Sequence, residues 1–371
     1  MYRLEIGQVD LPLRTPFTTA LRSVDHLSSM VLCIESKDGI KAYGEAAPTE
    51  VITGESKESI AACWAGRFAD VLRTHQSRGK NFDLRFLVQA IQNSVQGNTS
   101  AKAGFEIALY DYWAKSIGRP LSDLLGGSSR QLLNDLTISL ASPETMAKAA
   151  KTAIERGYQT LKLKVGQDSA LDLLRIQAVV DAVPAGTSLR LDANQGWTAK
   201  EAIQRIREIE QIVPHLDFIE QPVSARDFAG LKAVKESVNS LIMADESCFS
   251  PHDLIRLLEL RACDLLNLKL MKCGGLSTAI QMAELAELYE IPCMLGCMLE
   301  SNISVSAAAH LAAAIPNIQL IDLDGPCLIA EPSTLEGVSF AAAELKLNST
   351  AGLGINSLEP QNYTVLKEII L

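Results

Sequence analysis

Eight short apolar segments recur through the last two thirds of the chain, and each is followed by a stretch of helix-forming composition. They are Leu136–Leu140, Thr160–Val165, Ser188–Asn194, Asp217–Pro222, Leu241–Ser247, Leu265–Lys272, Cys293–Glu300 and Gln319–Asp324. Such alternation is typical of a parallel sheet covered by helices. A count of eight favours a closed barrel, although a doubly wound open sheet has the same local pattern. We therefore predict an α/β fold with a (β/α)8-type barrel.

The chain before this repeat mixes strand and helix signals. Two β-rich runs in Ser29–Ala46 surround Lys37-Asp38-Gly39, which predicts a hairpin. Ala101–Lys115 carries Ala103, Ile107, Tyr110 and Ala114 at the spacing of one apolar helix face. We expect an α+β region ahead of the barrel.

The composition limits the class of partner. A net charge of -10 argues against nucleic acid and favours a small-molecule substrate. The most apolar long segment, Ile291–Ile315, contains Pro292, Glu300 and His310, which argues against a membrane span. The N-terminus lacks the apolar stretch of a secretory signal, and the eight cysteines include no Cys-x-x-Cys pair. We predict a cytoplasmic protein whose cysteines are reduced core residues.

Ionisable residues gather where the predicted strands end, which is where barrels carry their active sites. They are Lys164, Asp192, Glu220, Asp245, Lys269, Glu300 and Asp324. Asp192, Glu220 and Asp245 end three consecutive strands, so their carboxylates would repel one another unless a cation neutralised them. Ligation by oxygen alone favours Mg²⁺. For any single acid, a helix N-cap or a salt bridge at the rim is the alternative.

Two lysines complete this group. Lys164 ends the second strand and Lys269 the sixth, so in a ring of eight they lie on opposite sides. Two bases on opposite faces of one carbon suit a 1,1-proton transfer, in which one removes a proton and the other returns it. Lys162 shares a face with Lys164, and we expect such neighbouring cations and burial to lower the pKa of the base. For Lys162 and Lys164 alone, a solvent-facing strand edge is the alternative.

Several motifs resemble the muconate-lactonizing subgroup of the enolase superfamily. The barrel motifs are KLK (162–164), LDANQGW (191–197), IEQP (219–222), ADES (244–247) and NLKLMKCGG (267–275), and the early ones are TPF (15–17), GEAAP (44–48) and ALYDYWAK (108–115). The resemblance implies an α+β capping domain, residues 1–125 completed by about 340–371, over a modified barrel of residues 126–339. It also implies one Mg²⁺ per subunit on Asp192, Glu220 and Asp245. Lys164 and Lys269 would be the acid/base pair, acting through an enediolate that Mg²⁺ stabilises.

The substrate is indicated by Asp322-Leu323-Asp324 at the end of the eighth strand. Two carboxylates there would bind an ammonium group, which a free dipeptide has and a muconate or N-acyl substrate lacks. This pair is similar to that of the dipeptide epimerases. Its alternative is a solvated loop pair.

The segment Thr15–Val24 resembles the capping loop of L-Ala-D/L-Glu epimerases, which implies that Arg22 contacts a glutamate side chain. By the same resemblance Thr137, Lys162 and Cys297 would line the substrate pocket. We therefore predict epimerisation of L-Ala-D-Glu and L-Ala-L-Glu by a possible homo-oligomer. The alternatives are other dipeptides, an N-acylamino acid racemase or cycloisomerase, and a non-catalytic barrel that binds a metal or a sugar acid.

Overall fold

The barrel consists of eight parallel strands that follow one another in chain order around the sheet. The computed structural model describes residues 2–79, 81–127, 131–331, 336–358 and 363–371. The strands are β5 (Leu136–Ile138), β6 (Thr160–Lys164), β7 (Ser188–Asp192), β8 (Leu216–Glu220), β9 (Ile242–Ala244), β10 (Leu265–Lys269), β11 (Cys293–Gly296) and β12 (Ile318–Asp322). A parallel bridge between Asn134 and Ile321 joins the first strand's entry to the last strand and closes the ring. The predicted barrel is confirmed.

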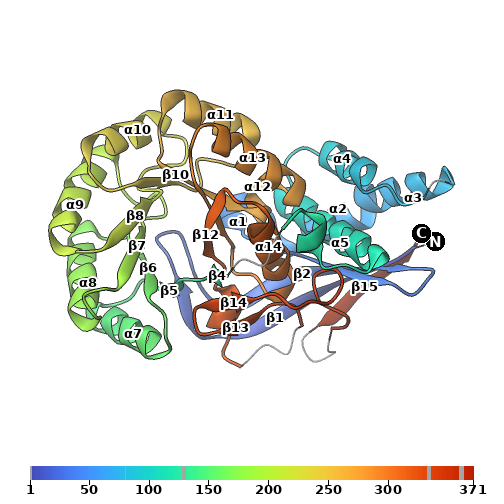
Figure 1. The fold of residues 1–371 in the computed structure, drawn as a ribbon, viewed down its shortest axis with the longest axis horizontal. Helices are drawn as coiled ribbons and strands as arrows, with labels where there is room; N and C mark the ends of the chain where they lie inside the picture. Colours follow the sequence, from blue (N-terminus) through green and yellow to red (C-terminus); the bar gives the residue numbers. More distant parts are fainter. Residues whose placement is uncertain (1, 80, 128–130, 332–335, 359–362) are drawn as a thin grey trace.

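Helices cover the outside of the barrel (Figure 1). They are α7 (Pro143–Glu155), α8 (Ser169–Ala182), α9 (Ala199–Ile212), α10 (Phe228–Ser237), α11 (Pro251–Leu260), α13 (Leu276–Leu288) and α14 (Asn302–Ala314), with the single turn α12 (Leu270–Cys273) ahead of α13. Thr198 and Glu201 form a capping box that starts α9. The eighth strand differs from the predicted repeat, because the short 3₁₀ helix η2 (Gly325–Leu328) follows it in place of an α-helix.

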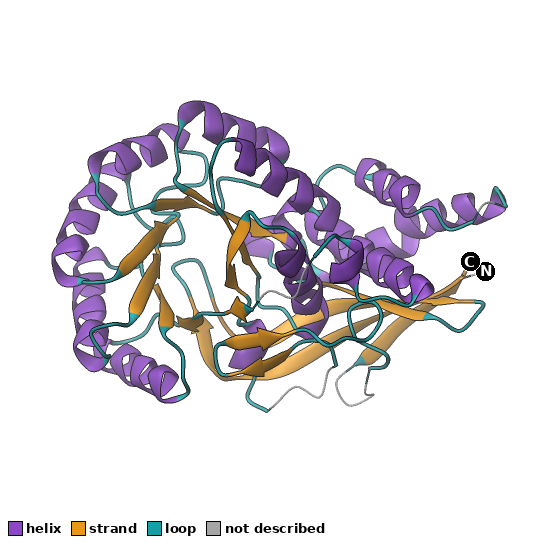
Figure 2. Cartoon of the chain, viewed as in Figure 1, coloured by secondary structure: helices purple, strands orange, loops and turns teal. Residues whose placement is uncertain are grey.

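A second region packs against one side of the barrel (Figure 2). Its antiparallel sheet has the order β15-β1-β2-β3 and contains the C-terminal strand. The strands are β1 (Tyr2–Thr18), β2 (Ser23–Ser36), β3 (Lys41–Ala46) and β15 (Thr364–Ile370). The helices are α1 (Glu50–Thr53), α2 (Lys57–Cys63), the π-helix η1 (Trp64–Phe68), α3 (Ala69–Ser77), α4 (Leu84–Ser94), α5 (Thr99–Ile117) and α6 (Leu121–Leu124). The predicted hairpin turn is confirmed, with Gly39 at φ 80° between β2 and β3.

Helix α5 contains the predicted helix Ala101–Lys115, but the expectation of a single apolar face is wrong. Nearly every side chain from Ser100 to Tyr112 is buried. The helix packs on β3 on one side and on α12 and α13 of the barrel on the other, so it has little solvent-facing surface. Helix α5 therefore lies in the interface between the two regions.

A small sheet with the order β13-β14-β4 lies next to the amino ends of the barrel strands. Its strands are β4 (Leu132–Leu133), β13 (Ser339–Ala341) and β14 (Glu344–Lys346). All eight cysteines are free thiols. Within the described ranges, no helix is long and apolar enough to cross a membrane.

The long hairpin β1–β2 extends over the barrel mouth. Phe17 pairs with Val24 and Thr18 with Ser23, so residues 19–22 form the tip. Two contacts hold the strand β1 to the barrel rim close to this tip. The N–H of Leu140 donates to the Thr18 carbonyl at 3.0 Å, and Nε of Arg14 donates to the Ile329 carbonyl at 2.8 Å. The hairpin tip is thereby positioned as one wall of a pocket.

Candidate active site

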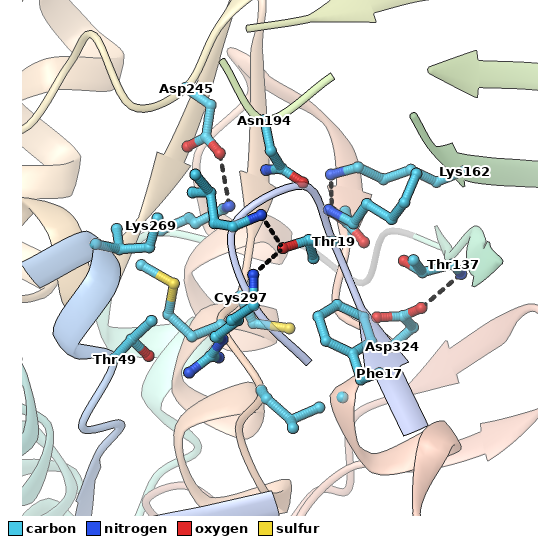
Figure 3. A pocket seen from close by; sticks show the side chains of 18 of the residues that line it. Phe17, Thr19, Thr49, Thr137, Lys162, Asn194, Asp245, Lys269, Cys297 and Asp324 are labelled. Atoms are coloured by element: carbon cyan, nitrogen blue, oxygen red, sulfur yellow. Dashed lines mark hydrogen bonds and ion pairs between the residues drawn. The ribbon is translucent and has the colours of Figure 1, made fainter. Parts of the chain in front are cut away.

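One pocket lies between the hairpin tip and the carboxyl ends of the barrel strands (Figure 3). Nine of the predicted site residues line it, namely Arg22, Thr137, Lys162, Lys164, Asp245, Lys269, Cys297, Asp322 and Asp324. Asp192 and Glu220 do not line the pocket. They are fully buried beneath it and are linked to its wall by ion pairs with Lys162. The structure therefore gathers the predicted residues from both regions of the fold.

The two predicted acid/base lysines are buried on opposite strands of the ring. Lys164 ends β6 and Lys269 ends β10, four strands further along. Their exposed fractions are 6% and 7%, which excludes a solvent-facing strand edge for Lys164. Nζ of Lys164 lies 2.6 Å from Oδ2 of Asp192, and Nζ of Lys269 lies 2.7 Å from Oδ2 of Asp245. Each lysine is thus held by one strand-end carboxylate.

Lys162 lies at the centre of the charged network, with an exposed fraction of 1%. Its Nζ is 2.7 Å from Oδ2 of Asp322, 2.7 Å from Oε2 of Glu220 and 3.2 Å from Oδ2 of Asp192. Burial alone would lower the pKa of Lys162, but these carboxylates outweigh it and raise that pKa well above its ordinary value. Lys162 is therefore a fixed cation.

The expectation that burial near cations lowers the pKa of the base is wrong for Lys269 in this arrangement. Burial does act in that direction, but the negative charges of Asp245 and Glu220 raise the pKa of Lys269 above its ordinary value. Lys269 therefore carries its proton here, as the proton donor of an acid/base pair would.

Asp192, Glu220 and Asp245 provide the oxygen donors that Mg²⁺ prefers. All three are fully buried at the ends of β7, β8 and β9, and Asp192 lies directly opposite Glu220 in the sheet. Burial and the charge of Asp192 raise the pKa of Glu220 to about 7. This repulsion between buried carboxylates is what a cation would relieve.

In this structure each of the three acids forms ion pairs with lysines. Asp245 forms ion pairs with both Lys269 and Lys272. These two cations outweigh burial and hold the pKa of Asp245 well below its usual range. Across the described ranges, no three His, Cys, Asp or Glu side chains converge to hold a metal. The chemistry of this all-oxygen donor set fits Mg²⁺.

Asp322 and Asp324 both line the pocket on the side of β12. Lys162 outweighs burial and lowers the pKa of Asp322 to about 2. Burial and the charge of Asp322 raise the pKa of Asp324 to about 6. The backbone N–H of Thr137 donates to Oδ2 of Asp324 at 2.7 Å, which helps to fix this carboxylate (Figure 3). The pair is buried, so the alternative of a solvated loop does not hold.

The remaining predicted residues lie on the other walls. Arg22 is half-buried at the hairpin tip, and within the described part of the chain its guanidinium has no carboxylate at ion-pair distance. Cys297 is half-buried, and burial raises the pKa of its thiol well above the ordinary value, so it stays neutral. Glu300 is placed differently from the prediction. It follows the end of β11 by four residues and bonds to Met298 and Ser304.

Sequence reasoning missed residues that hold the acids in place. The Gln221 side chain accepts bonds from the N–H groups of Asp245 and Ser247 at 2.9 and 3.1 Å. It also donates to Ser247 Oγ and to the Val223 carbonyl. Gln221 has φ 38°, a conformation that is uncommon for a residue with a side chain. The signal was its place directly after Glu220 in IEQP.

Two family models match the chain. The description "Mandelate racemase / muconate lactonizing enzyme, N-terminal domain" matches residues 1–126. "Enolase C-terminal domain-like" matches residues 145–360.

Individual proteins are similar over nearly the full length. An L-Ala-D/L-Glu epimerase of Clostridium acetobutylicum is 43% identical over 95% of this chain and 98% of its own. A substrate complex of the L-Ala-D/L-Glu epimerase of Bacillus subtilis has TM-score 0.91 and 40% identity over 95% and 97%. A dipeptide epimerase of Enterococcus faecalis V583, complexed with Mg and L-Leu-L-Tyr, has TM-score 0.86 and 35% identity over 96% and 99%. The chain therefore belongs to the dipeptide epimerases of the enolase superfamily, which are isomerases.

Proposed function

We propose that the chain epimerises a dipeptide at its C-terminal residue and interconverts L-Ala-D-Glu and L-Ala-L-Glu with Mg²⁺. One observation carries this proposal. Two buried lysines on opposite strands share a pocket with a buried pair of carboxylates. The lysines suit proton transfer at a carbon between them, and the carboxylates suit the free ammonium group of a dipeptide.

The pocket offers a partner for each charged group of L-Ala-Glu. Asp322 and Asp324 bind the substrate ammonium. Lys162, a buried cation, attracts the α-carboxylate. Arg22 binds the glutamate side chain as a planar guanidinium that can pair with a carboxylate through two bonds. Thr137 orients Asp324, and Cys297 contributes to the wall beside the substrate.

The proton transfer uses both lysines. One lysine acts as a neutral amine and takes the α-proton, and the electron pair of the C–H bond is delocalised into the substrate carboxylate. The other lysine is an ammonium and donates a proton to the opposite face of the same carbon. The configuration is inverted and the two lysines exchange protonation states. By analogy within the family, Lys164 handles the (R) proton and Lys269 the (S) proton.

Asp192, Glu220 and Asp245 would hold one Mg²⁺, which when bound supplies positive charge next to the substrate carboxylate. The related dipeptide epimerase of Enterococcus faecalis V583, which is complexed with Mg, supports this assignment. Gln221 holds the backbone of Asp245 and so orients one of the ligands.

We also propose a division of labour between the two regions. Residues 1–125, with about 340–371, act as a capping domain that selects the substrate, and residues 126–339 carry the acids and lysines. The small dipeptide suits a cytoplasmic enzyme in the salvage of cell-wall peptides, and a homo-oligomer is compatible with this function.

Other dipeptides are the second candidate. Met298 and Leu299 line the same pocket as Arg22, and the Enterococcus faecalis relative is complexed with L-Leu-L-Tyr. An N-acylamino acid racemase or a cycloisomerase would leave Asp322 and Asp324 without a cationic partner. A non-catalytic barrel would have no use for two opposed lysines.

The test is incubation of the purified protein with L-Ala-L-Glu and Mg²⁺ in D₂O, followed by ¹H NMR. We expect deuterium at the glutamate α-carbon and resonances of the second diastereomer. If neither appears, the proposed substrate is wrong. A panel of dipeptides with apolar and basic C-terminal residues then tests the class.

A further inference from the structure

The segment between β11 and α14 forms one wall of the pocket. Cys297, Met298 and Leu299 line it, and Ser301 is the N-cap of α14. The segment has few bonds of its own. The Cys297 N–H donates to the Asp322 carbonyl at 3.0 Å, and the Met298 N–H donates to Glu300 at 2.6 Å. Its shape therefore depends on where α14 begins.

A carboxylate from the other region of the fold fixes that beginning. Glu45 of β3 is fully buried. It accepts the Ser301 N–H at 2.8 Å, the Ser301 hydroxyl at 2.8 Å and the Ser304 N–H at 2.9 Å. Anionic groups are favourable at a helix N-terminus, where N–H groups lack partners within the helix.

The position of Glu45 is in turn fixed by close packing. A Cβ on Gly44 would lie 1.9 Å from the Gly104 carbonyl oxygen, so only glycine lets β3 and α5 approach this closely. Glu45 pairs with Val31 of β2, and β2 leads directly into the hairpin tip that carries Arg22. The same sheet thus holds both the hairpin tip and the carboxylate that caps α14, next to the wall of Cys297, Met298 and Leu299.

We propose that Glu45 is a positioning residue for substrate recognition, which sets the distance between the hairpin tip and the wall formed by Cys297, Met298 and Leu299. This inference rests on the proposed function. Glu45 touches no lining side chain of the pocket in the described bonds and acts through Ser301 and Ser304. Its loss should therefore weaken substrate binding, while the lysines on β6 and β10 keep their places.

The experiment compares Glu45→Gln with Glu55→Gln. Glu55 is a matched control, because it is also buried and also accepts two helix N-terminal N–H bonds, from Ser100 at 2.7 Å and Ala101 at 2.9 Å. Those bonds lie at the start of α5, and Glu55, Ser100 and Ala101 do not line the pocket. Both variants lose comparable charge-assisted bonds, so both should unfold at lower temperature.

We expect KM for the preferred dipeptide to rise about tenfold in E45Q, with kcat changed by less than about twofold. In E55Q, KM should stay at the wild-type value. A purely structural role would reduce the amount of active enzyme and hence the apparent kcat, and leave KM unchanged. An unchanged KM in E45Q would overturn the inference.

Hydrogen exchange of the amides in 297–301 provides a readout that does not depend on activity. These amides should exchange faster in E45Q than in E55Q or the wild type. If no dipeptide is turned over by the wild type, the proposed function fails, and this measurement still decides the role of Glu45. If E45Q does not fold, Ser301→Ala replaces it, with Ser250→Ala at the N-cap of α11 as its control. Equal exchange in that pair would refute the positioning role.

Discussion

The substitution Asp324→Asn distinguishes an epimerase for free dipeptides from an enzyme for N-acylated substrates. The change Asp324→Asn removes one negative charge and keeps an oxygen that can accept the Thr137 N–H bond. A hydrogen bond to a charged group contributes about 1.5–3 kcal/mol, and a neutral one about 0.5–1.5 kcal/mol. The expected loss is therefore about 1.5 kcal/mol, or about tenfold in kcat/KM for a free dipeptide.

The assay compares two ligands that differ only in the ammonium group. For L-Ala-L-Glu, kcat/KM is measured, and for N-acetyl-L-Ala-L-Glu the inhibition constant is measured. In the variant, kcat/KM for the free dipeptide should fall about tenfold. The acetylated dipeptide should bind at least as tightly as it does to the wild type. Asp135→Asn is the control, because Asp135 is buried below the pocket, bonded to Arg190, and does not line it. Equal weakening toward both ligands would refute the assignment of an ammonium receptor.

The same carboxylate predicts a pH dependence. Burial and Asp322 raise the pKa of Asp324 to about 6, so its negative charge is present above pH 6 and is lost as the pH falls. KM for the free dipeptide should thus rise by about tenfold between pH 7 and pH 5 in the wild type, and should rise less in Asp324→Asn. The absence of any difference between the two KM profiles would contradict this reasoning.

Three further predictions follow from the site and the fold. Lys164→Ala should lower epimerisation by at least about 10³-fold, and Lys269 should still exchange the α-proton of one isomer; turnover of both isomers in this variant would exclude two bases. Asp245→Asn should abolish the rise in melting temperature that Mg²⁺ gives the wild type, measured by calorimetry without substrate. His310 accepts the Ser122 N–H at 3.1 Å, and burial lowers its pKa to about 4, so the unfolded chain takes up its proton first. The free energy of unfolding should therefore fall by about 3 kcal/mol from pH 6.5 to pH 4, as followed by urea titration, and less in His310→Gln.

The barrel could be predicted because its strands are short, apolar and regularly spaced, and the parallel arrangement needs helices between them. The strand ends were less accurate. The prediction extended the sixth strand to Lys272, whereas β10 ends at Lys269 and a helical turn begins. The apolar run continues through both, and an apolar run alone does not distinguish a buried strand from a buried turn of helix.

The charged residues of the pocket were predictable for a related reason. In a parallel barrel each strand end lies at the same rim, so Lys164, Asp192 and Lys269 are brought to one mouth whatever the intervening helices do. Their protonation was not predictable. The pKa of Lys269 depends on Asp245 at 2.7 Å, and a distance between side chains is not contained in strand order.

Contacts between the two regions could not be predicted from the sequence. Glu45 and Ser301 are 256 positions apart in the sequence, and no periodic pattern relates them. Glu45 stands in GEAAP, which resembles the family's capping domain, but a motif of that kind does not identify the partner of its carboxylate. Gly44 packs closely against Gly104, and Glu45 beside it caps α14. Under the positioning role proposed for Glu45, substrate selection depends on this interface residue in addition to the residues that line the pocket.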